Sequence, residues 1–259
     1  MRISIVGAGR VAHHLAQVLS TQHQIVQVLN RNLQKAKSLA ALVNAEAIDS
    51  FEQLDSNIDL AIIAVSDQSI STVIGQVHYS LPDVLIVHTS GSTNLDVLTQ
   101  QHSRAGVFYP LQTFSLDREV DWSSTPLFVE AVNKSDLNIL TDLANSLSQD
   151  VYQYDSAQRL SLHLAAVFAC NFSNYCYDMA KQVVDAKQVD FSLLYPLILE
   201  TAQKATQHDP RLMQTGPAMR GDQNILNMHT SMLADAQQVE LQQVYRLLSG
   251  QILKRHTAS

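Results

Sequence analysis

Three small residues near the start of the chain, Gly7, Gly9 and Ala12, have the types and spacing that a bound dinucleotide requires. In the G-x-G-x-x-A pattern the first glycine permits a tight turn, the second lets the backbone approach a pyrophosphate, and the small third residue lets a helix pack closely on a strand. The phosphates would meet the free N–H groups and positive dipole end of that helix. The alternative is an ordinary glycine-rich turn. We expect cofactor contacts from the whole motif: Gly7, Ala8, Gly9, Arg10, Val11 and Ala12.

A second group of polar residues lies in the later half of the chain, where His163, Asn171 and Asn174 could do acid–base chemistry. At 100° per residue they share an arc of roughly 120° on one helix with Cys170 and Tyr177. Buried amides need partners, so this face is either a satisfied core network or a substrate site. We expect catalysis here, with His163 as proton donor because imidazole titrates near neutrality. Asn171 or Asn174 would hold the polarised oxygen or nitrogen of a substrate.

The residues that follow the second strand-like run, 25–29, bear on which nucleotide binds. A carboxylate at this point bonds the ribose 2′-hydroxyl of NAD. The chain has Asn30 and Arg31 instead. Arg31 could pair with a 2′-phosphate and Asn30 could bond it without repelling it. We therefore predict NADP rather than NAD, the alternative being a solvated arginine beside an asparagine helix cap.

Two further strand ends are expected to line the cofactor, because strand carboxyl ends form the crevice in open α/β sheets. Asp67 also suits the N-cap of the next helix, and this role can coexist with lining the crevice. The polar residues after the run 84–88 form either such a rim or a turn that caps a following helix. The predicted contacts at these two ends are Val65, Ser66, Asp67, Thr89 and Ser90.

Four residues are predicted to contact the substrate: His88, Tyr109, Arg220 and His229. Pro110 forces the residue before it toward extended geometry, which would aim Tyr109 outward, although a structural role for this segment is the alternative. Arg220 lies between glycine breakers and could bind an anionic group. We expect a small-molecule substrate, and an anionic group on it would be the partner of Arg220. His229 follows in the next helix and could face the same site.

The elements that position these residues change in type along the chain. Up to residue 155 strands alternate with helices, a rhythm that predicts a parallel sheet covered on both faces. From residue 156 no convincing strand follows, and helices are expected at 160–181, 191–207, 223–234 and 239–253. We predict a Rossmann dinucleotide-binding domain over 1–155 and an all-helical substrate and dimerisation domain over 156–259. The expected strands are 3–6, 25–29, 60–65, 84–88, 106–109, 127–132 and 151–154, and the helices between them include 11–19, 33–43, 69–77, 95–101 and 137–147.

Composition excludes several classes of protein. The 259 residues carry a formal net charge of −7 and no basic stripe, so we expect no nucleic acid. No apolar run approaches the roughly 20 residues that span a bilayer, and the chain starts with a strand rather than a leader peptide. Cys170 and Cys176 would stand about 9 Å apart on one helix, too far for a disulfide. A reduced, cytoplasmic setting without a bound metal is expected.

These pieces resemble the oxidoreductases that join a Rossmann-like domain to a helical domain of unknown function, DUF2520. They belong to the superfamily of pyrroline-5-carboxylate reductase, ketopantoate reductase and 6-phosphogluconate dehydrogenase. The resemblance covers nearly the whole chain and implies NADP binding, a homodimer built through the helical domains, and a substrate cleft between the domains. It rests on residues 7–12, 88–92, 109–114, 163–174 and 216–222.

The chain departs from better-known relatives, which leaves the function open between two hypotheses. β-Hydroxyacid dehydrogenases place a catalytic lysine on the long helix. The corresponding helix of this chain has His163 and no lysine before Lys181. The first hypothesis is an NADP(H)-dependent reductase or dehydrogenase acting on a small carbonyl or imine substrate. The alternative is a non-catalytic NADP(H) sensor or regulatory dimer. A deazaflavin coenzyme is a further option, since some distant relatives use one.

Overall fold

A computed structural model describes residues 1–257 and divides the chain into two compact units, Met1–Ala169 and the residues from Cys170 onward. The first unit is built on one eight-stranded sheet of order β3-β2-β1-β4-β5-β6-β7-β8. All neighbouring strands are parallel except β6 and β7, which are antiparallel. The strands are β1 (Arg2–Val6), β2 (Gln24–Leu29), β3 (Glu46–Ile48), β4 (Leu60–Ile63), β5 (Leu85–His88), β6 (Ala105–Pro110), β7 (Leu127–Ala131) and β8 (Val151–Gln153).

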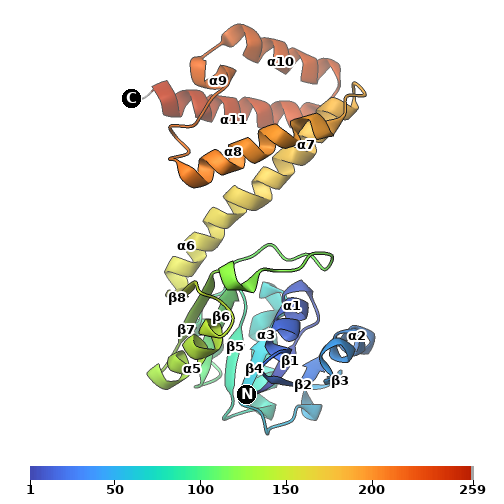
Figure 1. Ribbon diagram of the computed structural model, residues 1–259, viewed down its shortest axis with the longest axis vertical. Helices are drawn as coiled ribbons and strands as arrows, with labels where there is room; N and C mark the ends of the chain where they lie inside the picture. The colour runs from blue at the N-terminus through green and yellow to red at the C-terminus, as the bar shows by residue number, and fades with distance from the viewer. Residues whose placement is uncertain (258–259) are drawn as a thin grey trace. The chain divides into compact units, whose positions relative to one another are not determined.

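Helices cover both faces of this sheet, as Figure 1 shows. Successive side chains of the buried strands point to opposite faces, so both faces are apolar and each packs against helices. Ile3 and Ile5 of β1 pack with helices α1, α2 and α5 in one apolar cluster. Val6 belongs to the cluster on the other face, with α3 and α4. The helices of this unit are α1 (Arg10–Ser20), α2 (Leu33–Val43), α3 (Asp67–Ser80), α4 (Asp96–Thr99), α5 (Lys134–Asn145) and α6 (Ser156–Ala166). The predicted Rossmann-type architecture is thus confirmed.

The described elements of the second unit are all helices, joined by turns and loops. After a π-helical turn over Val167–Phe172, it consists of α7 (Ser173–Asp185), α8 (Tyr195–Gln207), α9 (Pro217–Arg220), α10 (Gln223–Asp235) and α11 (Val239–Thr257). Helices α9, α10 and α11 pack on one another. Pro196 lies in the first turn of α8, where its missing N–H costs nothing.

Two predicted helices need correction, and one edge strand was not predicted. The edge strand β3 has only three residues, too few for an alternating pattern to show. Helix α4 is a single turn over Asp96–Thr99 rather than 95–101. The helix expected over 160–181 begins at Ser156 and is interrupted by the π-helical turn, where the two compact units also divide. Within residues 1–257 no helix combines the length and apolarity needed to cross a membrane.

Candidate active site

The turn between β1 and α1 has the backbone that the glycine motif predicts. Gly7 has a φ of +125°, in the left-handed region, and its N–H bonds the carbonyl of Leu29 at 2.8 Å. A Cβ at this position would overlap the backbone carbonyl of Ala64. Gly7 is therefore required by both conformation and space.

Gly9 is the N-cap of α1 and leaves the start of that helix open. Its backbone is extended, it provides no side-chain cap, and the first turn contains no acidic residue. The first intrahelical bond runs from His13 N–H to the Gly9 carbonyl, so earlier N–H groups of α1 remain free for an anion. A Cβ built at Gly9 would have no neighbouring atom within 4 Å. This open, uncapped helix start fits a dinucleotide pyrophosphate.

Of the residues after β2, the two asparagines make local hydrogen bonds, whereas the side chain of Arg31 is left unbonded within residues 1–257. Asn30 accepts the N–H of Asn32 at 2.9 Å, and Asn32 caps α2 by accepting the N–H of Lys35 at 3.2 Å. Arg31 is exposed, and within residues 1–257 its guanidinium makes no hydrogen bond or ion pair. The guanidinium is therefore free to pair with a 2′-phosphate, and that contact stays a prediction.

The end of β4 differs in detail from the prediction. Ser66, not Asp67, is the N-cap of α3, and its hydroxyl lies 2.9 Å from that of Ser69. Asp67 is the first helical residue instead, which frees its carboxylate to accept a hydrogen bond from the Ser92 hydroxyl. This contact joins the ends of β4 and β5 and was not predicted.

The loop between β5 and α4, residues 89–95, is held by its own hydrogen bonds. The Ser90 hydroxyl accepts the N–H groups of Ser92 and Thr93, at 3.1 and 2.9 Å. Ser90 N–H in turn donates to His88 Nδ1 at 3.1 Å. Because these bonds lock Ser90 and Ser92 together, the loop presents a fixed polar edge beside the end of the sheet.

His88 supports this loop from inside the unit. Its side chain has no exposed surface, and burial, with a smaller contribution from Arg159, lowers the pKa of the imidazole to about 3. The ring therefore stays neutral, with Nδ1 accepting and the proton on Nε2. Within residues 1–257 Nε2 has no hydrogen-bond partner. This buried position gives His88 a supporting role, and its predicted substrate contact stays a prediction.

Tyr109 and His163 form a pair at the same edge of the sheet. The Tyr109 hydroxyl lies 3.3 Å from His163 Nδ1, and the two rings meet edge to face. Burial raises the pKa of Tyr109 to about 12, which keeps the phenol protonated. With the phenol as donor, Nδ1 of half-buried His163 accepts and Nε2 carries a proton. The pair can then donate a proton to an oxygen or nitrogen.

Gly91 leaves room for this pair because it has no side chain. It was not among the predicted site residues. A Cβ at Gly91 would lie 2.6 Å from Tyr109 Cζ and 2.7 Å from His163 Nδ1. With any side chain there, the loop or the two residues would have to shift. A glycine between serines in a strand-end loop is the only signal that could have suggested such a close approach.

The remaining predicted site residues lie in the second unit. Asn171, in the π-helical turn, and Asn174, in α7, are both exposed, and Arg220 is the exposed last residue of α9. His229 is half-buried and bonds the Tyr245 hydroxyl at 2.9 Å. The projection that put His163 and the two asparagines on one face assumed 100° per residue, which a π-helical turn does not keep.

Comparisons with known proteins agree with this geometry. The family model "NADP oxidoreductase coenzyme F420-dependent" matches residues 2–91, and "Domain of unknown function (DUF2520)" matches residues 125–252. No curated protein matches the chain.

Solved structures extend the likeness over the whole chain. A Bacteroides fragilis protein proposed to be an NADP oxidoreductase is 39% identical, with 98% of each chain covered and a TM-score of 0.92. An imine reductase from Myxococcus stipitatus in complex with NADP+ shares 14% identity over 98% of this chain and 92% of that one, with a TM-score of 0.69. Pyrroline carboxylate reductase from Plasmodium falciparum with NADP bound shares 13% over 99% and 98%, with a TM-score of 0.55. The last two show a common fold.

Proposed function

This chain belongs to the DUF2520 family of NADP oxidoreductases, and on that premise we propose that it transfers hydride between NADP(H) and a small carbonyl or imine substrate. The observation that carries the proposal is the Tyr109–His163 pair, because it sets a proton donor at the edge of the sheet where the glycine turn opens.

The residues that would hold the nicotinamide cofactor follow from the strand ends. The free N–H groups at the start of α1 would bind the pyrophosphate, and Arg31 and Asn30 the 2′-phosphate. When bound, NADPH supplies a hydride to the substrate carbon and leaves as NADP+. The remaining proposed contacts line the edge between these points: Val65, Ser66, Asp67, Thr89 and Ser90.

The chain's own part of the reaction is proton transfer. As hydride adds to the C=O or C=N carbon, the pair of electrons in that bond moves to the oxygen or nitrogen. This atom then takes the proton of His163 Nε2 while Nδ1 takes the hydroxyl proton of Tyr109, so the pair as a whole gives up one proton. Tyr109 keeps Nδ1 as an acceptor, so the proton of the neutral imidazole is on the nitrogen that faces away from the phenol. Solvent restores the proton after product release.

Two experiments test the proposal in sequence. Calorimetric titration with NADPH, NADH and a deazaflavin coenzyme identifies the cofactor. A screen of carbonyl and imine compounds then follows loss of NADPH absorbance. We expect tight NADPH binding and turnover of at least one substrate that His163→Asn reduces by about 100-fold or more, the usual contribution of a general acid. Failure of NADPH to bind would refute the proposal, and binding without turnover would favour a sensor.

We also propose that the protein acts as a homodimer joined through its helical unit. Among described residues 170–257 only Ala218 and Leu226 are buried, which leaves many large apolar side chains exposed in a single chain. Exposed apolar surface on this scale marks an association surface. The substrate contacts predicted for Asn171, Asn174, Arg220 and His229 remain proposals, which single alanine variants can test once a substrate is known.

A further inference from the structure

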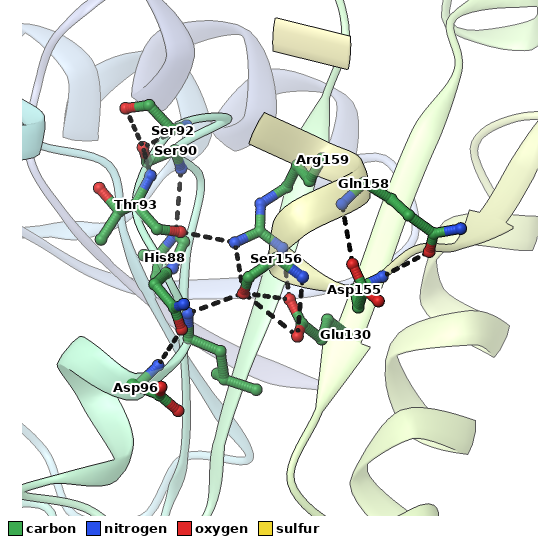
Figure 2. Close-up of polar contacts among 12 residues, drawn as sticks. His88, Ser90, Ser92, Thr93, Asp96, Glu130, Asp155, Ser156, Gln158 and Arg159 are labelled. Atoms are coloured by element: carbon green, nitrogen blue, oxygen red, sulfur yellow. Dashed lines mark hydrogen bonds and ion pairs between the residues drawn. The ribbon is translucent and has the colours of Figure 1, made fainter. Parts of the chain in front are cut away.

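The first turn of α6, the helix that carries His163, is anchored by a buried arginine. Arg159 is only 1% exposed, although arginine is rarely buried without partners. Figure 2 shows its guanidinium between Thr93 of the β5–α4 loop, Ser156 of its own helix and Glu130 of β7. The arginine thus touches the three elements that frame the Tyr109–His163 pair.

The contacts of Arg159 use the fork shape of its guanidinium. Nη1 forms an ion pair with the Glu130 carboxylate, which is itself 19% exposed. Nη2 donates to the Thr93 carbonyl at 2.5 Å and to the Ser156 hydroxyl at 3.1 Å. A lysine has a single charged nitrogen and could not reach these partners in one plane.

Ser156 completes the anchor with both its hydroxyl and its backbone N–H. Within residues 1–257, the buried Nε of Arg159 has no hydrogen-bond partner. The Ser156 hydroxyl donates to Glu130 at 2.9 Å and accepts both the Leu95 N–H, at 3.0 Å, and Arg159. Its own N–H, free at the helix start, donates to Glu130 at 3.2 Å. The start of α6 is therefore bonded to β7 and to the loop at the same time.

Stability alone does not account for such a network. Burying an arginine and a carboxylate removes both from water, and an apolar replacement of a buried ion pair is often neutral or stabilising. What an ion pair of fixed geometry provides is a defined placement of the elements that it joins. Here the ion pair joins α6 to β7, and the same guanidinium bonds the β5–α4 loop, which meets α6 at Gly91.

We propose that Arg159 is a positioning residue that holds His163 against Tyr109. Arg159 lies four residues before His163, one turn away on the same face of α6. Through Thr93 it also holds the loop whose Gly91 packs against both members of the pair. Without Arg159, α6 and the loop would lose their common anchor and the Tyr109–His163 hydrogen bond would break. That this placement serves proton transfer rests on the proposed function.

The test reads the imidazole of His163 directly, without nucleotide or substrate. Long-range ¹H–¹⁵N spectra of the full chain with labelled histidine report which ring nitrogen accepts a hydrogen bond. His163→Asn assigns the signal, and Tyr109→Phe defines its position when the hydrogen bond is absent. We expect Arg159→Gln to move the His163 Nδ1 signal by more than half of the difference between wild type and Tyr109→Phe. A smaller movement would overturn the proposal.

A matched control separates positioning from a general loss of stability. Arg104 forms an ion pair with buried Asp136 at 2.6 Å elsewhere in the same unit, beside His102. Arg104→Gln should move the His102 signal and leave His163 in place, and an equal movement of His163 would also overturn the proposal. Should Arg159→Gln fail to fold, Glu130→Gln is judged by the same criterion. Because no nucleotide is present, failure here is distinct from failure of NADPH to bind.

Discussion

Gly7 and Gly9 stand two residues apart in one turn, yet the structure constrains them differently. Gly7 has no room for a Cβ and a positive φ, whereas Gly9 has an open neighbourhood and an ordinary φ. We expect Gly9→Ala to leave the thermal unfolding midpoint within a few degrees of wild type and to weaken NADPH binding at least tenfold. The reason is that its Cβ would occupy space the pyrophosphate needs.

Gly7→Ala is the matched comparison, measured by the same calorimetric titration and thermal unfolding. It should destabilise the first unit by well over 1 kcal/mol, since alanine is strained at positive φ and its Cβ overlaps backbone. Equal NADPH affinity of Gly9→Ala and wild type would show that the pyrophosphate does not approach Gly9.

Arg31 tests the choice between NADPH and NADH. Its guanidinium is exposed, and hydrogen bonds to charged groups contribute about 1.5–3 kcal/mol. Arg31→Ala should therefore weaken NADPH binding by roughly tenfold to a hundredfold and leave NADH binding unchanged, as read by calorimetry. Lys134→Ala, which removes an exposed cation on α5 of the same unit, is the control for a general charge effect and should leave both affinities unchanged. A parallel loss for both nucleotides would contradict recognition of a 2′-phosphate.

The buried His88 gives the fold a pH dependence. Burial lowers its pKa from the ordinary value of 6.5 to about 3. Between pH 6.5 and pH 3, the imidazole is therefore protonated in the unfolded chain and neutral in the folded chain. This contribution to stability is complete above pH 6.5 and is lost as the pH falls toward 3. Urea unfolding at a series of pH values should show stability falling through this window. His88→Asn keeps an acceptor for Ser90 and should flatten the slope; an unchanged slope would contradict the neutral buried imidazole.

At the scale of elements, the first half of the fold could be predicted because its strands are apolar and separated by periodic helices. The edge strand β3 could not, since three residues carry no pattern. The π-helical turn could not either, because the side-chain sequence around Val167–Phe172 reads as ordinary amphipathic helix. It bears on the predicted site, because the 100° per residue assumed between His163 and the two asparagines does not hold through such a turn.

Some residues of the candidate site could be predicted from the sequence, but the hydrogen bonds between them could not. Tyr109 and His163 were both singled out, yet the bond between them crosses 54 positions and depends on how β6 and α6 meet. Arg159 was missed because a lone arginine on a helix reads as a solvent-exposed charge, and only tertiary structure reveals its partners. Long-range polar contacts of this kind have no periodicity in the sequence.

Gly91→Ala tests how closely the loop, β6 and α6 approach one another. Its Cβ would lie within 3 Å of Tyr109 and His163, so either these side chains or the loop must move. We expect the His163 Nδ1 signal to move to its position in Tyr109→Phe, and turnover of any identified substrate to fall by about tenfold or more. Gly250→Ala, on α11, has no atom within 4 Å of its Cβ and should change neither quantity. An unchanged His163 signal would contradict this prediction, because it would show that the loop moves to accommodate the added methyl group.

At the scale of the whole molecule, the two units differ in how much core a single chain provides. The sheet unit buries two apolar clusters, whereas residues 170–257 bury only Ala218 and Leu226. A helical unit of this size without a core of its own must cover its apolar side chains with another surface. A second copy of the chain can cover them without any other protein. A stable interface would bury about 800 Å² on each copy.

Leu197 of α8 tests this dimer, because its side chain is 62% exposed in one chain. A charge placed in a buried apolar interface has no partner, so Leu197→Asp should shift the protein from twice the mass of one chain to the monomer in sedimentation equilibrium. Leu42→Asp is the control, since Leu42 is similarly exposed at 56% but lies on α2 of the sheet unit. It should leave the dimer intact. A monomeric wild-type protein at micromolar concentration, or equal dissociation of both variants, would contradict a dimer built on the helical unit.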